Sequence, residues 1–138
     1  MHTTTQIKVR GYHEDRFQHV NNARYLEFLE DGRWDHFDQR GLDDGFFDRL
    51  GIFPVVVRIT ISYRRPAHAG DTLSIATRVV SAGSRKIVIG QTVVSETTGK
   101  PCVDAEVTVV FLSKETGRPV SISDEMRRAW PDLENAGH

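Results

Sequence analysis

The spacing of apolar residues predicts a short strand and then a long helix in the first third of the chain. Ile7 and Val9 alternate with polar neighbours, which favours a strand over residues 6–12. After a polar loop, residues 22–40 have helical spacing, with Asn21 or Asn22 as a suitable cap and Gly41 as a suitable stop. The apolar stripe expected on this helix consists of Tyr25, Leu26, Leu29, Arg33, His36 and Phe37.

Beyond residue 52 the alternation has a period of two, which predicts four more strands. They are expected at residues 53–64, 72–80, 85–96 and 103–111. Within the first of them, one face is expected to carry Val55, Val57, Ile59, Ile61 and Tyr63. Turns rich in Gly, Ser and Pro separate the last three strands, so these should pair as hairpins.

Two short helices and a loose tail complete the expected element order. The helices are predicted around residues 43–50 and 124–130, and residues 131–138 are expected to form a frayed tail. The order of a strand, a long helix and four strands predicts an α+β fold, in which the helix packs on one face of a mostly antiparallel sheet. A sheet covered by one helix leaves much surface open, and valines occur on both strand faces, so we expect a homo-oligomer rather than a monomer.

Composition limits the classes of function. With 138 residues, the chain fits a single domain over 1–138, and 18 basic against 19 acidic residues argue against general nucleic-acid binding. The single cysteine, Cys102, excludes an intrachain disulfide and suits a reducing cytoplasm. No signal-peptide pattern or membrane-spanning run is evident, so we expect a cytoplasmic protein without a membrane partner. No metal-ligand spacing, serine-hydrolase elbow or phosphate loop stands out, and no cofactor is expected.

The loop before the long helix carries the strongest chemical signal. Asp15 stands seven positions before Asn22, the first expected helical residue. A carboxylate that faces a helix N-terminus can act on a carbonyl group, because the free backbone N–H groups stabilise negative charge on oxygen. The simpler alternative is that Asp15 caps a turn and that water satisfies the N–H groups.

Two segments resemble the hotdog fold, and within it the 4-hydroxybenzoyl-CoA thioesterase-like acyl-CoA thioesterases. Residues 9–26 read V-R-G-Y-H-E-D-R-F-Q-H-V-N-N-A-R-Y-L, similar to the family's loop of the form D-x-D, two residues, G-H-V-N-N, two residues, Y. Residues 63–71 read Y-R-R-P-A-H-A-G-D, like the family's aromatic-basic-basic-Pro-Ala segment. The resemblance implies an antiparallel five-stranded sheet wrapped on one long central helix, in a dimer or tetramer.

The resemblance also implies roles for particular residues. The family's catalytic carboxylate falls on Asp15, as nucleophile or general base, with the backbone N–H of Asn22 as oxyanion donor. His13 stands where the family has a second acid, and Gln18 stands where it has glycine. Glu30 is a reserve carboxylate, because some hotdog thioesterases use a glutamate on the helix, although a solvated helix charge is the simpler interpretation.

The remaining candidates concern proton transfer and substrate binding. His19 can assist proton transfer or hold the loop, and Asn21 can orient Asp15 or cap the helix. Tyr25 can line an acyl pocket or belong to the core. Coenzyme A carries phosphates that arginine forks bind well, and the candidates near strand ends are Arg64, Arg65 and Arg85.

Hydrolysis of an acyl-CoA thioester to free acid and CoA is therefore the leading hypothesis. A hotdog hydratase or dehydratase is the first alternative, with His13 or His19 paired with Asp15. A non-catalytic module that binds acyl thioesters is the second.

Overall fold

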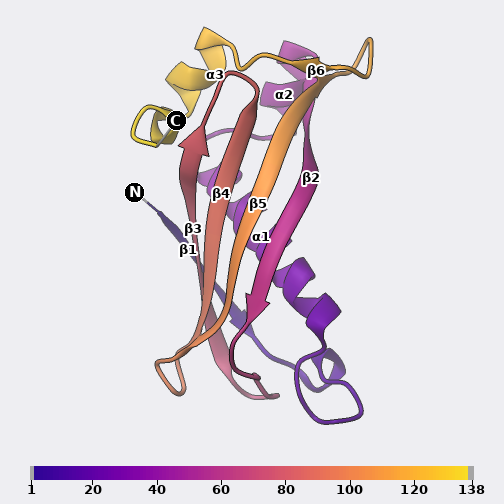
Figure 1. The fold of residues 1–138 in the computed structure, drawn as a ribbon, viewed down its shortest axis with the longest axis vertical. Helices are drawn as coiled ribbons and strands as arrows, with labels where there is room; N and C mark the ends of the chain where they lie inside the picture. The colour runs from indigo at the N-terminus through magenta and orange to yellow at the C-terminus, as the bar shows by residue number, and fades with distance from the viewer. Residues whose placement is uncertain (1, 137–138) are drawn as a thin grey trace.

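In the computed structural model, which describes residues 2–136, an antiparallel sheet curves around one long helix, α1 (Asn22–Gln39) (Figure 1). The strands are β1 (Thr3–Lys8), β2 (Ile52–Tyr63), β3 (Thr72–Ala82), β4 (Lys86–Ser95), β5 (Pro101–Ser113) and the two-residue β6 (Pro119–Val120). The shorter helical segments are η1 (Gly11–His13), α2 (Asp44–Leu50), α3 (Asp124–Ala129) and η2 (Pro131–Leu133).

The sheet has the order β1-β3-β4-β5-β2, and every pair in it is antiparallel. The predicted α+β class, the five expected strands and the hairpins that join β3, β4 and β5 are confirmed. The additional β6 pairs with the end of β5. Because β1 and β2 are the edges, β2 has one side without a partner strand among the described residues. In Figure 1, the loop before α1 lies at one end of the sheet, while α2 and α3 lie at the other.

The first strand begins and ends earlier than its apolar pattern predicted. Thr3, Thr4 and Thr5 already pair with β3, whereas residues 11–13 form a short 3-10 helix. Threonine is β-branched and suits a strand, but its hydroxyl hides it from a search for apolar alternation. The predicted range of 6–12 was therefore wrong at both ends.

Strand β2 contains a bulge that reverses the expected facing of its first half. Val56 pairs with Val109, and the next pair is Arg58 with Thr108, so Val57 is an extra residue. The extra residue changes the phase of the alternation. Ile59 opposes the buried Val107, whereas Val55 and Val57 do not share its face. The prediction that these valines lie on the same face as Ile59 was therefore wrong.

Helix α1 is capped as expected, but its buried stripe differs. The Asn21 side chain accepts a hydrogen bond from the Ala23 N–H, and Gly41 follows the helix in a left-handed conformation, φ +73°. Leu26 is exposed rather than buried, whereas Phe28 and Gly32 belong to the buried face. The stripe is rotated because α1 packs closest on β1 and β3 rather than on β2.

A polar layer crosses the interface between α1 and the sheet. Gln91 on β4 donates hydrogen bonds to the Leu29 carbonyl at 2.8 Å and to Thr77 at 2.9 Å, and it accepts one from Arg33 at 3.1 Å. A Cβ atom on Gly32 would lie 2.9 Å from the Gln91 amide nitrogen, so glycine is what lets the helix approach this closely. The layer lies between two apolar clusters, one near the start of α1 and the other near its end.

The end of α1 is tied to the C-terminal segment through buried polar groups. His36 is fully buried, accepts a hydrogen bond from the Trp130 indole N–H at 3.0 Å and therefore donates one to Thr3. Arg40 forms a two-pronged ion pair with the buried Asp132, with bonds of 2.7 and 3.0 Å, and also donates to Thr3.

These contacts correct part of the expected frayed tail. Residues 131–133 form η2, and Leu133 is fully buried. The tail packs because its one large apolar side chain and its buried carboxylate both have partners in the body of the fold. Residues 137 and 138 of the predicted tail lie outside the described residues.

Candidate active site

A groove of about 470 Å³ opens between the loop at residues 13–20, the start of α1 and the end of β2. Its lining residues are Asp15, Phe17, His19, Val20, Asn22, Tyr25, Tyr63, Arg64, Arg65 and Pro66. Six of the nine site residues predicted from the sequence lie on this groove, although they come from three separate parts of the chain.

Asp15 both caps a turn and presents an oxygen without a partner. Its backbone N–H donates to the His19 carbonyl, and its carbonyl accepts from the Gln18 N–H, each at 2.9 Å. Its Oδ1 accepts from the Phe17 N–H at 2.8 Å. No hydrogen bond engages Oδ2 within the described part of the chain. The turn therefore fixes the carboxylate and leaves one of its oxygens available in the groove.

Gln18 adopts an unusual backbone conformation at the tip of this turn. Its φ of +64° makes it the one non-glycine residue with positive φ among residues 2–136. The His68 ring holds it there, because Nδ1 lies 3.0 Å from the Gln18 carbonyl and must donate to that acceptor. His19 packs edge-on against His68, with ring centroids 5.1 Å apart. This conformation is one that glycine adopts readily, which agrees with the glycine in the family's loop.

The start of α1 supplies a free donor beside Asp15. Asn21 serves as the cap and does not line the groove. The backbone N–H of Asn22 has no acceptor among the described residues, and the Asn22 carbonyl accepts from the Tyr63 hydroxyl at 3.2 Å. The partial positive charge at a helix N-terminus favours an oxyanion at this position.

Tyr25 contributes a second donor that lacks a partner. The side chain is buried, and its hydroxyl makes no hydrogen bond of ordinary geometry with the described residues, although the Ala67 backbone faces it. Burial, with a smaller effect from Cys102, raises the pKa of Tyr25 to about 12. The phenol therefore stays protonated near neutral pH and can donate to a bound oxygen atom.

The two arginines at the end of β2 are in different states. Arg64 is paired with Asp104, which also accepts a hydrogen bond from Thr92. The Arg65 side chain is exposed, and no hydrogen bond or ion pair engages it in residues 2–136. Arg65 is therefore the more available cation for an anionic ligand in the groove.

Glu30 and Arg85 do not lie on this groove. Glu30 lines a separate cavity between α1 and β2, more than two helical turns along from Asn22. Arg85 lies in the turn between β3 and β4, at the opposite end of the sheet from Tyr63. Both residues were plausible candidates from the sequence, but the folded topology places them away from the groove.

His13 lies behind the loop rather than on the groove. Its Nδ1 accepts from the Arg10 N–H at 2.9 Å, and its ring packs edge-on against Phe28. Burial lowers the pKa of His13, and the charge of Arg24 adds to this effect. A neutral His13 in this position supports η1 and supplies no carboxylate next to Asp15.

Three supporting residues were missed as site residues in the sequence. Tyr63 reaches the first residue of α1, His68 holds the turn, and the Glu14 carboxylate accepts from the Ala69 N–H at 3.0 Å. All three join the loop to the segment at residues 63–71. The two motifs that carry the family resemblance therefore form one structural unit, and their joint presence in the sequence was the available signal.

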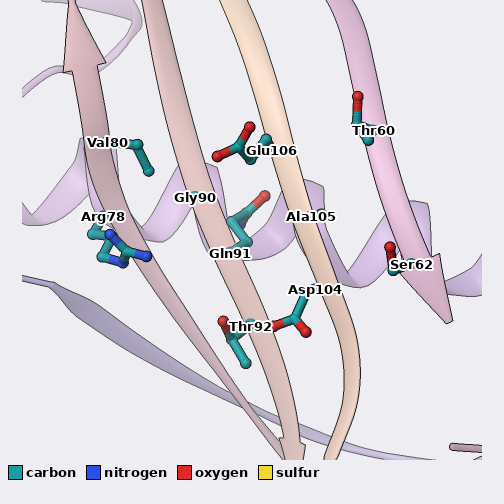
Figure 2. A pocket seen from close by; sticks show the side chains of 10 residues that line it. All are labelled: Thr60, Ser62, Arg78, Val80, Gly90, Gln91, Thr92, Asp104, Ala105 and Glu106. Carbon is teal, nitrogen blue, oxygen red and sulfur yellow. Dashed lines mark hydrogen bonds between the residues drawn. The ribbon is translucent and has the colours of Figure 1, made fainter. Parts of the chain in front are cut away.

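A second hollow lies on the sheet face that points away from α1 (Figure 2). Its volume is about 240 Å³, and Gly90 lies in its floor between Arg78 and Glu106, where a Cβ atom would come within 2.6 Å of the Val80 side chain. Asp104 lines one end of it and pairs with Arg64 of the groove. None of the predicted site residues lines this hollow.

No group of three or more His, Cys, Asp and Glu side chains in residues 2–136 is arranged to hold a metal ion. None of the described helices has both the length and the hydropathy needed to cross a bilayer.

Comparison with known proteins identifies the family. The model of the thioesterase-like superfamily matches residues 9–130. Long-chain acyl-CoA thioesterase FadM of Escherichia coli (strain K12) is 42% identical over 125 residues, which cover 89% of this chain and 92% of that protein.

Solved structures agree with this assignment. The chain resembles the crystal structure of YbaW, described as a probable thioesterase from Escherichia coli, with a TM-score of 0.82 and 39% identity over 94% of this chain and 97% of that one. It shares the fold of Slr0204, a 1,4-dihydroxy-2-naphthoyl-CoA thioesterase from Synechocystis, with a TM-score of 0.85 and 16% identity, over 97% and 98% of the two chains. The chain therefore belongs to the thioesterase-like superfamily, and it is a thioesterase of the hotdog fold.

Proposed function

We propose that the chain hydrolyses acyl-CoA thioesters in the groove at the start of α1, with Asp15 as the reacting carboxylate. The observation that carries this proposal is the presence of two unpartnered polar groups in one groove, Asp15 Oδ2 and the Asn22 N–H, with the unpartnered Tyr25 hydroxyl buried in its wall. The similarity to FadM supports the choice of acyl-CoA as substrate.

Two routes use the same groups. In the first, Asp15 Oδ2 attacks the thioester carbon, the C–S bond breaks to release CoA thiolate, and water hydrolyses the resulting anhydride. In the second, Asp15 takes a proton from a water molecule whose oxygen attacks the carbon directly, and the C–S bond then breaks to release CoA thiolate and the free acid. In both, negative charge develops on the thioester oxygen, where the Asn22 N–H stabilises it.

Tyr25 and His19 complete the catalytic groove. The protonated phenol of Tyr25 donates to an oxygen of the substrate, which removes the cost of a buried donor without a partner. His19 packs on His68 and fixes the turn that orients Asp15. Asn21 acts through the helix cap, and we give Glu30 no part in the hydrolytic step.

Arg65 binds the phosphates of coenzyme A. It has no partner among the described residues, whereas Arg64 must first leave Asp104. Arg65→Met should therefore raise KM for acyl-CoA more than Arg64→Met does, and the difference should shrink as salt screens the phosphates. Arg85 lies at the opposite end of the sheet from this groove and has no part in phosphate binding.

The chain forms a homodimer through the free edge of β2. This strand leaves Val57 at its bulge 54% exposed, and Val56 and Tyr63 are also exposed, which is unusual for an edge strand that stays unpaired. Val57→Lys should convert the dimer to a monomer in sedimentation-velocity measurements. A wild-type chain that sediments as a monomer at every concentration would contradict the dimer.

The decisive test measures thiol release from a panel of acyl-CoA thioesters. We expect Asp15→Asn to lower kcat by about a hundredfold or more, since the reacting oxygen loses its charge. Asp31→Asn, which removes an exposed carboxylate on α1 without a partner among the described residues, is the matched control and should retain activity. Equal rates for the wild type and Asp15→Asn would remove Asp15 from the mechanism.

The same panel distinguishes the other hypotheses. Turnover of an enoyl-CoA without thiol release would indicate a hydratase, and tight binding without any turnover would indicate a binding module. A single turnover in isotopically labelled water separates the two routes, because only the anhydride route can place label in the Asp15 side chain.

A further inference from the structure

The cavity that contains Glu30 has a buried cation in its wall. Its volume is about 250 Å³, and it lies between α1 and the first half of β2. Most of its lining is apolar, and the full set of residues is Glu30, Arg33, Trp34, Phe37, Pro54, Val56 and Val109. A guanidinium group in such surroundings is unusual, because a buried charge normally has an ionic partner.

Arg33 is only partly satisfied by its surroundings. It is 8% exposed, and its single hydrogen bond among the described residues runs from Nη1 to Gln91 Oε1. No carboxylate in residues 2–136 lies within 4.0 Å of the group, although Glu30 at the mouth interacts with it at longer range. Gln91 is held by Leu29 and Thr77, so Arg33 is kept in place with donors left over.

The cavity and the catalytic groove share the same two walls. Tyr25, Leu29 and Arg33 follow one another at four-residue spacing on α1. On β2, the side chains of Tyr63, Ile61, Ile59 and Val56 oppose Val103, Ala105, Val107 and Val109, respectively, and so point to the helix side. Arg33 comes eleven residues after Asn22, a distance of about 16 Å along the helix axis. The two cavities share no lining residue, and the distance between them is one that a long acyl group held at Asp15 spans when it runs between these walls.

We propose that Arg33 recognises an oxygen acceptor, above all a carboxylate, at the far end of the acyl group, so that this cavity selects long acyl thioesters that are oxygenated at their distal end. This inference rests on the proposed hydrolysis. The apolar wall of Trp34 and Val56 accommodates the hydrocarbon, and the free N–H groups of Arg33 bind the terminal oxygen atoms. A plain hydrocarbon end would instead bury the guanidinium without giving it a partner, which disfavours it.

The test compares two substrates of equal length, tetradecanedioyl-CoA and tetradecanoyl-CoA, by their ratio of kcat/KM. We expect the wild type to favour the dicarboxylic substrate by roughly tenfold or more, the value of a charge-assisted hydrogen bond. Arg33→Met keeps the aliphatic stem and should reverse the preference, whereas Arg33→Lys should retain part of it. Glu30→Gln removes the opposing charge at the mouth and should increase the preference.

Each ratio is taken within one variant, so a general loss of activity cancels. Thiol release summed over both substrates reports separately on the proposed function: its absence in the wild type with tetradecanoyl-CoA and with tetradecanedioyl-CoA alike would reject hydrolysis itself. A ratio that Arg33→Met leaves unchanged would overturn the role of Arg33. If that variant weakened the dimer in sedimentation and left the ratio unchanged, Arg33 would be assigned to the subunit contact instead.

Discussion

The two ends of α1 differ in whether the polar groups around them have hydrogen-bond partners. At the C-terminal end, His36, Trp130, Thr3, Arg40 and Asp132 form a closed set in which every side chain has a partner. At the N-terminal end, the groove leaves polar atoms open, as the Tyr25 hydroxyl and the Asn22 N–H have no partners among the described residues. Closed networks hold a fold together, whereas open ones cost stability and are retained where a ligand completes them.

The largest effect on stability is expected from breaking the closed network. Asp132→Asn leaves the Arg40 guanidinium, whose side chain is only 13% exposed, without its counterion, which should lower the free energy of unfolding by about 3 kcal/mol. Glu125→Gln makes the same chemical change in the exposed pair with Arg49 and should cost less than about 1 kcal/mol. Chemical denaturation of both variants measures the difference. Equal losses would show that burial does not set the value of these pairs.

Acid should weaken the same end of the helix before it affects the ion pair. Burial, with a smaller effect from Arg40, lowers the pKa of His36 from 6.5 to about 4. Between these values the unfolded chain binds a proton that the folded chain does not, so stability falls as pH decreases through this window. One pKa unit corresponds to about 1.4 kcal/mol, so the full loss is about 3 kcal/mol.

Protonation of Asp132 affects stability only at lower pH. Burial alone would raise the pKa of Asp132, but the hydrogen bonds and charge of Arg40 outweigh burial and lower it below 3.8. The contribution of the ionised Asp132 to folding stability is therefore fully present above pH 3.8 and is lost only as the pH falls below this value. Denaturation of His36→Phe as a function of pH provides the control, because this variant should lose the slope between 6.5 and 4 whatever its overall stability. A slope that persists in His36→Phe would assign the effect to other groups.

The sequence predicted the open end of the molecule better than the closed end. The loop and the helix cap carry polar residues whose roles depend on neighbours close in the chain, so Asp15, Asn21 and Asn22 could be placed beforehand. The partners of His36 lie 33 and 94 residues away, at Thr3 and Trp130, and no local pattern joins them. The frayed tail was predicted for this reason.

The errors within β2 and in the site have a similar origin. A bulge adds one residue without changing composition, so the alternation around Val57 gave no sign of it. Glu30 and Arg85 were plausible from residue type, but their distance from Asp15 depends on how the helix and sheet are oriented. Arg33 was predicted only as part of a stripe, because its lack of a counterion is a property of the folded chain.

A smaller effect is expected at Tyr25, where stability and activity should move in opposite directions. Tyr25→Phe removes a buried hydroxyl that has no partner, so the free chain should become more stable by about 1 kcal/mol. The same change removes a donor to the substrate and should lower kcat/KM by about fivefold. Tyr63→Phe is the matched control, because its hydroxyl already bonds the Asn22 carbonyl and its loss should not stabilise the chain. A less stable Tyr25→Phe would show that the hydroxyl has a partner in the free protein.

The smallest effect concerns Gln18, whose backbone is strained in the loop that orients Asp15. At φ +64°, a residue with a Cβ costs about 1–2 kcal/mol, while glycine costs about 0.5–1 kcal/mol more to order on folding. Gln18→Gly should therefore stabilise the chain by about 0.5 kcal/mol in chemical denaturation. Gln18→Ala keeps the strain and should show no gain, which separates the backbone from the side chain. If Gln18→Gly also kept full thiol release, the glutamine would have no role in the groove. A gain in stability with a loss of activity would instead group Gln18 with Tyr25. Both would then be residues that are retained at the open end of α1 for activity, at the expense of stability.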